Sequence, residues 1–235
     1  MKQKLKLWNV AAAIAVCLAI CMIFAGCSDS DGSSGDSGGG SYKIKMTTEA
    51  EKVDFYLKGS GVATFDWGDG SKKVSLTLND GEYTTGTRFE HTYPNASIRT
   101  ITVNGNNITF LNCMGNKLTT LDVSKITSLT ILYCGENKLT ALDVSKNTEM
   151  TGMNCAHNSL TRLDVSKNTS LIYLYCFDNK FTAEGLNALF GTLHSNAIEG
   201  EGQEKEIFIS SNPGTDSCDA SKAESKGWSV NTSFQ

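Results

Sequence analysis

One sequence motif recurs four times at a constant interval of 21 residues, and this repeat constrains the fold more than any other feature. The rows are ITFLNCMGNKLTTLDVSKITS, LTILYCGENKLTALDVSKNTE, MTGMNCAHNSLTRLDVSKNTS and LIYLYCFDNKFTAEGLNALFG. They share L-x-C-x-x-N-x-L, with Met153 and Phe181 as the only apolar replacements in that pattern. A fixed period of this length predicts a solenoid, in which each repeat packs on its neighbours.

Each row is expected to hold one short strand with a buried face and an outward face. Leu132 and Cys134 alternate with Tyr133, so the first two point to the same side. Parallel strands stack about 4.8 Å apart, which places equivalent residues in columns. The sequence therefore predicts a cysteine column and an asparagine column, the latter bonded to backbone groups of adjacent turns. Their members are Cys113, Cys134, Cys155, Cys176 and Asn116, Asn137, Asn158, Asn179.

The cysteine column is interpreted as a set of small buried side chains, because a free cysteine packs well in an apolar interior. Disulfides between adjacent rows are a second interpretation, since neighbouring strands can bring two thiols within bonding distance. A metal site is not expected, because four ligands must converge on one point and this column is linear.

Taken together, the four rows resemble the cysteine-ladder leucine-rich repeats of bacterial surface proteins, the internalin-J-like type. The resemblance covers residues 108–191. It implies a parallel-stranded solenoid that serves adhesion or recognition, and it does not imply an enzyme.

The C-terminal flank is expected to cap the solenoid, because the last repeat would otherwise expose its core. Residues 105–191 are assigned to the repeats and residues 192–235 to the cap. Apolar spacing predicts a helix over residues 182–195 that begins at Thr182, then a strand over residues 207–212. In that strand Ile209 takes the cysteine position and Asn212 the asparagine position. A short helix over residues 216–226, a buried Cys218 and an edge containing Trp228 are expected to follow.

Residues 42–104 predict a small β-sandwich, because alternating runs such as VDFYL and RTITV are separated by turn residues. The segments FDWGDGS and HTYP resemble those of the PKD-like immunoglobulin-type fold, in which the D-x-G-D-G turn and the H-x-Y pair are structural. The predicted fold class is therefore mixed. A small Ig/PKD-like β-sandwich is followed by a short leucine-rich-repeat solenoid of parallel strands with a helix-containing C-terminal cap.

Two carboxylates in the predicted sandwich offer the oxygen ligands that Ca²⁺ takes, namely Asp66 and Asp69. The favoured interpretation is a tight turn in which these side chains bond their own backbone. His91 is expected to be a hydrogen-bonded packing residue beside Tyr93. No cofactor is expected.

The first 26 residues have a lysine-bearing start and an apolar run, and they predict a secretory signal. The ending FAGC resembles a bacterial lipobox, which implies lipidation of Cys27; an ordinary cleaved signal or a short anchor helix are the alternatives. Residues 27–41 contain Gly, Ser and Asp and predict a flexible tether. Their acidic start resembles an export signal of Bacteroidetes lipoproteins. The expected location is the bacterial cell envelope, with the chain lipid-anchored at the outer-membrane surface.

Residues between the buried positions of each strand are expected to form a ligand-binding concave face rich in exposed aromatic side chains, because apolar patches mark interaction sites. The alternative is that these side chains pack on one another or on the sandwich. The candidate residues are Phe110, Asn112, Ile131, Tyr133, Asn154, Tyr173, Tyr175, Phe177 and Phe208.

A polar column is expected beside this face, formed by Glu136, His157 and Asp178. The carboxylates would favour protonated His157 in a salt-linked cluster. A metal site is the sharper alternative, but the column offers only one histidine, so no metal is assigned. On the opposite side Asp122, Asp143 and Asp164 beside Lys125, Lys146 and Lys167 predict a solvated face.

The sequence favours a binding protein over an enzyme. It contains no G-x-S-x-G, H-E-x-x-H or phosphate-binding loop, so no catalytic residues are assigned. Net charge is −4 without a basic run outside the signal, so no nucleic-acid partner is expected. Two hypotheses follow: a tethered module that binds a protein or glycan through the concave face, or an assembly component whose concave face docks another envelope protein.

Overall fold

The computed structural model describes residues 43–80, 86–198 and 204–233, all of which belong to one compact unit. The predicted signal segment, the tether and the lipidation site Cys27 lie outside the described residues. Within these ranges, no helix combines the length and apolar character that crossing a bilayer requires.

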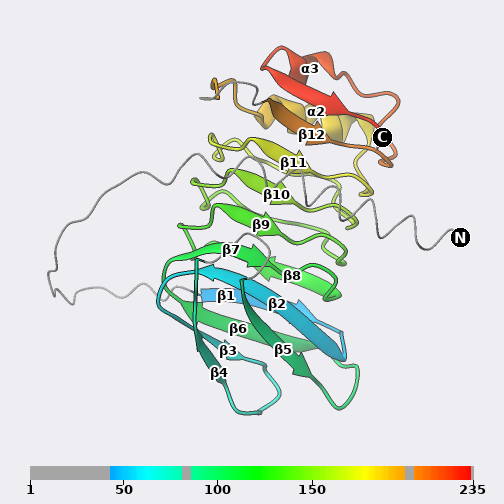
Figure 1. Ribbon diagram of the computed structural model, residues 1–235. Coiled ribbons are helices and arrows are strands. Elements are labelled where there is room, and N and C mark those ends of the chain that lie inside the picture. Colours follow the sequence, from blue (N-terminus) through cyan, green and yellow to red (C-terminus); the bar gives the residue numbers. More distant parts are fainter. Residues whose placement is uncertain (1–42, 81–85, 199–203, 234–235) are drawn as a thin grey trace, which may run out of the picture. The chain divides into compact units, whose positions relative to one another are not determined.

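The described strands form two sheets (Figure 1). One sheet has the order β4-β3-β6-β1-β8 and the other β13-β12-β11-β10-β9-β7-β2-β5. The strands are β1 (Lys43–Thr48), β2 (Lys52–Gly59), β3 (Val62–Asp66), β4 (Val74–Thr77), β5 (Thr87–Thr92), β6 (Arg99–Gly105), β7 (Ile108–Asn112), β8 (Leu118–Asp122), β9 (Ile131–Tyr133), β10 (Gly152–Asn154), β11 (Tyr173–Tyr175), β12 (Lys205–Phe208) and β13 (Trp228–Asn231).

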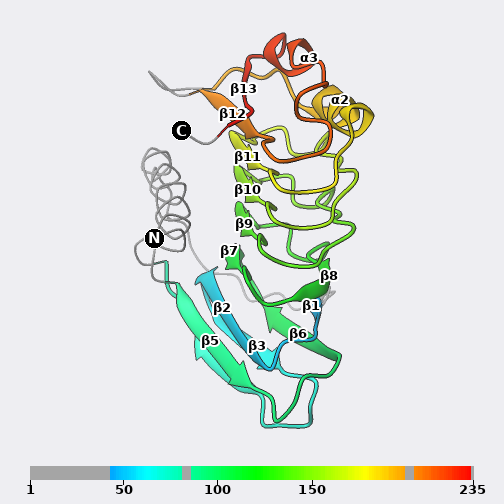
Figure 2. The ribbon, with the colours of Figure 1, turned by 90° about the vertical axis from the view of Figure 1, so that its right-hand side faces the viewer.

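The repeats form the predicted solenoid of parallel strands. Leu111 pairs with Leu132, Leu132 with Met153, and Met153 with Leu174, so each step along the sheet equals one 21-residue repeat. Strands β12 and β13 continue the parallel order. Figure 2 shows these strands stacked on one side, with the returning loops on the other.

Residues 43–104 share both sheets with the first repeat. Strand β2 pairs antiparallel with β7, and β1 pairs antiparallel with β8. Between the two layers, the ring of Phe65 lies 5.6 Å from Phe55 and 4.2 Å from Phe89, so aromatic side chains from both sheets meet in the core. The layered antiparallel arrangement agrees with a sandwich. Its PKD-like identity and the domain boundary at residue 104 stay predictions.

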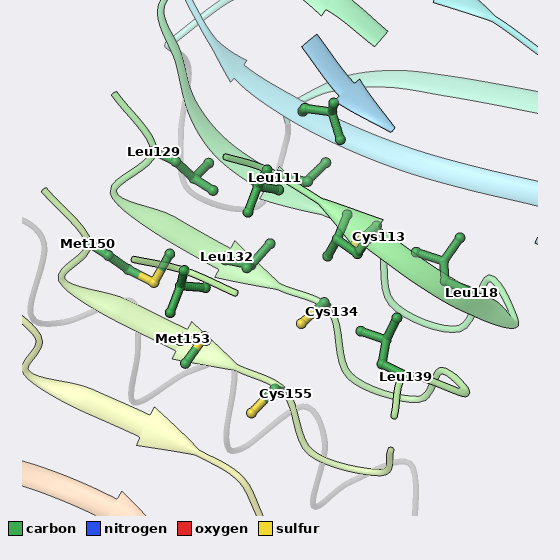
Figure 3. Close-up of a cluster of buried hydrophobic side chains, with 14 of the residues drawn as sticks. Leu111, Cys113, Leu118, Leu129, Leu132, Cys134, Leu139, Met150, Met153 and Cys155 are labelled. Carbon is green, nitrogen blue, oxygen red and sulfur yellow. The ribbon is translucent and has the colours of Figure 1, made fainter. Parts of the chain in front are cut away.

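The cysteine column forms as predicted. Cys113, Cys134, Cys155 and Cys176 are free, fully buried thiols, and Figure 3 shows the first three in a row along successive strands. Burial raises the pKa of all four thiols, that of Cys155 to about 12. The structure thus contains packed thiols in this column and not interstrand disulfides.

The asparagine column also forms, and Asn137 illustrates its bonds. Its Nδ2 donates to the carbonyls of Cys113, Cys134 and Gly135 at 3.0 to 3.1 Å. Its Oδ1 accepts from the backbone N–H groups of Asn116 and Leu118. Each such amide ties one turn to its neighbour, so these side chains specify the solenoid while satisfying buried backbone groups.

A second ladder of amides, formed by Asn147 and Asn168, was not predicted. Asn147 Nδ2 donates to the carbonyls of Val123 and Ile126, and Asn168 Nδ2 donates to those of Val144 and Asn147. The sequence signal that could have predicted this second ladder is the asparagine of the segment SKNT, which two rows share. The first row has Ile126 at the equivalent position.

The C-terminal cap agrees with its main predicted features. Helix α2 (Ala183–Thr192) begins after Thr182, whose Oγ1 accepts from Gly185 N–H, and it buries Leu186, Leu189 and Phe190. Lys226 closes its other end by donating to the carbonyls of Phe190, Gly191 and Leu193. An ammonium there stabilises the negative end of the helix dipole.

Two expectations for the rest of the cap are corrected. The helix expected over residues 216–226 is only α3 (Ser221–Glu224), because the chain before it forms hydrogen-bonded turns, including Cys218 N–H to Gly214 O. Cys218 was expected to be a buried thiol, but it is only half-buried. Asn212 does occupy the asparagine column, with Nδ2 donating to the carbonyls of Cys176 and Ile209.

Candidate ligand-binding face

Two columns of side chains lie on the strand face opposite the solenoid core, here named the outer strand face. Leu132, Met153 and Leu174 point inward and are fully buried, so the residues before and after each of them point outward. The strand register aligns them across neighbouring strands. The first column is Phe110, Ile131, Gly152, Tyr173 and Glu206, and the second column is Asn112, Tyr133, Asn154, Tyr175 and Phe208.

Strand β2 extends both columns beyond the repeats. Lys58 pairs with Phe110 and Tyr56 with Asn112, and Lys58 Nζ lies 5.7 Å from the centre of the Phe110 ring. Sequence reasoning missed Lys58 and Tyr56 because their segment was assigned to a separate domain. It also missed Glu206. Residues two apart on a strand lie on the same face, so the position of Glu206 two residues before Phe208 could have indicated it.

Several aromatic side chains of the outer strand face are less exposed than the sequence pattern predicts. Tyr133, Phe177 and Phe208 are half-buried. Phe110, Ile131, Tyr173 and Tyr175 retain only 8%, 6%, 2% and 3% of their accessible surface. The expectation that all these side chains are exposed is therefore wrong for the last four.

Contacts among the rings contribute to this burial. The ring of Tyr175 stacks on Phe208 at 4.6 Å and lies 5.9 Å from Tyr173. The ring of Tyr173 lies over Gly152, where an added Cβ would come within 2.0 Å of Tyr173 Cζ. Gly152 therefore leaves the space that the neighbouring tyrosine fills, and the aromatic side chains form a packed layer.

The two amides of the second column are held in one orientation by their own turns. Asn112 Oδ1 accepts from Met114 N–H at 3.1 Å, and Asn154 Oδ1 accepts from Ala156 N–H at 3.0 Å. Within the part of the chain that the structure describes, neither Nδ2 group has a hydrogen-bond partner. Each amide therefore offers two N–H donors at a fixed position.

The predicted polar column has a shared backbone conformation. Glu136, His157 and Asp178 have positive φ angles of 55°, 53° and 49°, and Gly115 occupies the equivalent position of the first repeat with φ 70°. Non-glycine residues rarely adopt this left-handed conformation. The turn before each ladder asparagine therefore imposes it on all three residues.

Only two members of this column are in contact. His157 Nδ1 lies 2.5 Å from Asp178 Oδ2, and its ring packs edge-on against Phe177 at 4.9 Å. Glu136 makes no bond to His157 among the described contacts. No group of three metal-ligating side chains occurs in the described ranges, so the metal alternative gains no support.

The carboxylates of the predicted sandwich turn have the turn-building role that was favoured for them. Asp66 Oδ1 accepts from Gly68 N–H, and Asp69 Oδ1 accepts from Ser71 N–H. Lys73 bonds to Asp66 at 3.0 Å and lowers its pKa, together with the Gly68 N–H. The hydrogen bonds from Ser71 hold the pKa of Asp69 well below its usual range.

His91 completes this turn as a packing residue. Its Nε2 lies 2.7 Å from Asp69 Oδ2, and its ring stacks on Trp67 at 4.9 Å. The ring also packs edge-on against Tyr93, whose hydroxyl donates to Trp67 O. The Asp and His side chains are thus used in stabilising the turn.

Comparisons with known proteins give matches among solved structures. No protein-family model matches the chain, and no curated protein matches it. Among solved structures, the chain is similar to the functional domain of InlJ from Listeria monocytogenes, which includes a cysteine ladder. The identity is 26% and the TM-score 0.39, over 51% of this chain and 24% of that chain. The chain is also similar to the internalin inlF from Listeria monocytogenes. The identity is 23% and the TM-score 0.32, over 48% of this chain and 37% of that chain. The chain therefore spans well under two thirds of the length of either protein.

Proposed function

We propose that this chain is a non-catalytic recognition module that binds a protein or glycan through the outer strand face. A lipid on Cys27 holds it at the surface of a bacterial cell. The observation that carries the proposal is the pair of in-register columns, which collects aromatic and amide side chains from five successive strands on one face. Aromatic side chains gathered in this way are typical of binding surfaces.

The rigidity of the face supports a role in binding. Every strand of the face is hydrogen-bonded to its neighbours, and the turns after the strands are tied together by amides such as Asn137 and Asn158. A surface that is already ordered loses little conformational entropy when a ligand binds, which favours affinity.

The state of the nucleophiles supports a non-catalytic role. Burial raises the pKa of the four column thiols, so they remain protonated at neutral pH and out of reach of substrates. Asp66 and Asp69 have lowered pKa values and are bonded within their own turn, which makes them poor proton donors.

A binding screen tests the proposal. The full chain is displayed in many copies on beads and applied to arrays of glycans and of host-matrix proteins, because multivalency makes weak binding detectable. We expect reproducible binding that is lost in the variants Tyr133→Ala and Tyr175→Ala. The control is Thr148→Ala, an exposed position in a returning loop, which should bind like the unmodified chain.

A blank array would contradict the recognition role. The assembly alternative then predicts that an envelope protein co-purifies with the unmodified chain and is lost from the same two tyrosine variants.

A further inference from the structure

The second column of the outer strand face alternates two kinds of side chain. Its order from β7 to β12 is Asn112, Tyr133, Asn154, Tyr175 and Phe208. Neighbouring positions lie one strand apart, roughly 4.8 Å. The first four residues therefore place an amide and an aromatic ring at alternate strands, and the pattern runs across the strands rather than along them.

The amides of this column act as donors. Because Asn112 Oδ1 and Asn154 Oδ1 accept from Met114 and Ala156 N–H, their Nδ2 groups point their two N–H bonds away from the turn. A fixed pair of donors without a partner among the described residues suits a ligand rich in acceptor oxygens.

The rings of the column supply apolar contact between these donors. Tyr133 lies between Asn112 and Asn154, and Phe208 stacks on Tyr175, which acts as its support. A pyranose unit carries both matching features, because its hydroxyl oxygens accept hydrogen bonds and its axial C–H face stacks on aromatic rings. Its length in an extended chain is similar to the spacing of the strands.

An extended peptide fits this pattern less well. A peptide usually binds a sheet by adding a strand to an exposed edge. The second column runs over the middle of the sheet, where the backbone groups of β9, β10 and β11 are already bonded on both sides. A peptide lying there would leave its own backbone groups without these partners.

Charge at the border of the face selects against acidic ligands. Glu136 and Asp178 are exposed beside the column, and Glu206 is half-buried on β12 next to Tyr173. Carboxylates repel uronic acids and sulfates, whereas they accept hydrogen bonds from neutral hydroxyl groups. Lys58 lies at the far end of the first column, over the ring of Phe110.

We infer that the ligand of the proposed recognition module is an extended, uncharged glycan that crosses the strands along the second column, with the amides donating to its oxygens and the half-buried rings of Tyr133 and Phe208 contacting its sugars. This inference rests on the proposed function. It names one of the two ligand classes that the proposed function leaves open.

Calorimetric titration of the full chain with linear oligosaccharides provides the test. The probes are β-1,4-linked oligomers of glucose, mannose and N-acetylglucosamine of increasing length, with oligogalacturonate as the acidic comparison. We expect at least one neutral series to bind. Its affinity should rise with length until the oligomer spans the column, and oligogalacturonate should bind at least tenfold more weakly. Stronger binding of the acidic series, or affinity independent of length, would overturn the inference.

The variant Asn154→Asp tests the contribution of the two N–H donors of this amide to binding. An aspartate keeps the oxygen that accepts from Ala156 N–H, so the turn is retained, but both N–H donors are replaced by an acceptor. We expect the affinity for the neutral oligomer to fall about tenfold or more, with an unchanged midpoint of urea unfolding. Asn106→Asp, in the exposed turn between β6 and β7, is the matched control. Unaltered affinity in Asn154→Asp would overturn the inference.

Other outcomes separate the inference from the proposed function. One outcome is that no oligosaccharide binds, but a protein on the array binds and this binding is lost in Tyr133→Ala. The inference of a glycan ligand is then wrong, and the recognition role stands. If neither class binds, both proposals are wrong.

Discussion

The side-chain amide of Asn116 exchanges two hydrogen bonds of 2.8 Å with the backbone N–H and C=O of Asp54. In later repeats the equivalent amide bonds to the turn of the preceding repeat, as Asn137 bonds to Cys113 O. Strand β2 therefore takes the position of a preceding repeat. Thr48 adds a hydrogen bond from its Oγ1 to Asn116 O. Residues 43–104 thus cover the first repeat as an N-terminal cap, which a solenoid requires.

Replacing Asn116 with Ala should destabilise the chain by about 1 to 3 kcal/mol, because the partly buried backbone groups of Asp54 would lose their partners. Urea unfolding followed by circular dichroism measures the loss. Asn106→Ala removes an exposed amide with no described bonds and should change stability by less than about 0.5 kcal/mol. Equal losses of unfolding free energy in the two variants would show that the packing of β2 on the first repeat does not depend on the asparagine column.

Gly59 lies where β2 passes the turn before β7, and its replacement by Ala should cost more than about 2 kcal/mol. Its φ is 141°, and an added Cβ would lie 2.0 Å from Asn107 O, a backbone atom that cannot move aside. Gly61→Ala is the control, since Gly61 has φ 83° but nothing within 4 Å of the added Cβ. The difference between the two free energies of unfolding measures the clash. A difference near zero contradicts the close approach of β2 and the turn.

The thiols should react with a maleimide reagent in two phases. Cys218 is half-buried and should react first, while the four column thiols are fully buried and should react only when the chain unfolds. Mass spectrometry of the peptides that carry these five cysteines follows both phases, and Cys218→Ser should remove the early phase from this set. Failure of the column thiols to react even after unfolding without reductant would indicate disulfides between repeats.

Acid should weaken the solenoid through three equivalent carboxylates, one in each of the first three repeats. Hydrogen bonds from Ser124, Ser145 and Ser166 lower the pKa values of Asp122, Asp143 and Asp164, respectively. A carboxylate with a folded-state pKa below its unfolded value of about 4 contributes stability above that pH, and this contribution is lost as the pH falls through the folded pKa. The midpoint of urea unfolding should therefore decrease between pH 5 and pH 3.

The triple variant Asp122→Asn, Asp143→Asn and Asp164→Asn provides the control for this pH dependence. An asparagine oxygen accepts the same backbone hydrogen bonds without titrating. The decrease in the unfolding midpoint should be smaller in this variant. A pH dependence that is identical to that of the unmodified chain would assign the effect to other carboxylates.

The repeat was predictable because its physical cause is local. Equivalent residues such as Cys134 and Cys155 are 21 positions apart, and the period of two along a strand determines which of them are buried. Thr182 was predictable because an N-cap depends on a few neighbouring residues. Asn212 was predictable because it follows Ile209 at the same spacing at which Asn179 follows Cys176. These positions account for the solenoid, the cysteine and asparagine columns and the start of helix α2.

The junction with residues 43–104 was not predictable, because it depends on pairings across large separations in sequence. Asp54 meets Asn116 across 62 residues, and Thr48 meets the same residue across 68. Nothing in the pattern of β2 distinguishes a strand of a separate domain from one that completes a neighbouring sheet. Lys58 and Tyr56 were missed as members of the outer strand face for this reason.

How far the side chains of the outer strand face are exposed could not be predicted from the sequence either. Alternation places Tyr173 on the outward side of β11, but it does not show that the ring lies over Gly152 on the next strand. Similarly, the pattern placed Glu136, His157 and Asp178 in one column without showing that only the last two meet. Side-chain direction depends on the space that neighbouring strands leave.

The position of β1 has a mechanical consequence. This strand lies between β6 and β8, paired with the former over six residue pairs and with the latter over four. Tension applied to the chain ahead of Lys43 therefore pulls on a strand held from both sides, whereas an edge strand such as β4 is held from one. Extracting β1 requires both ladders to break, and the rupture of the first repeat follows because β8 loses its neighbour.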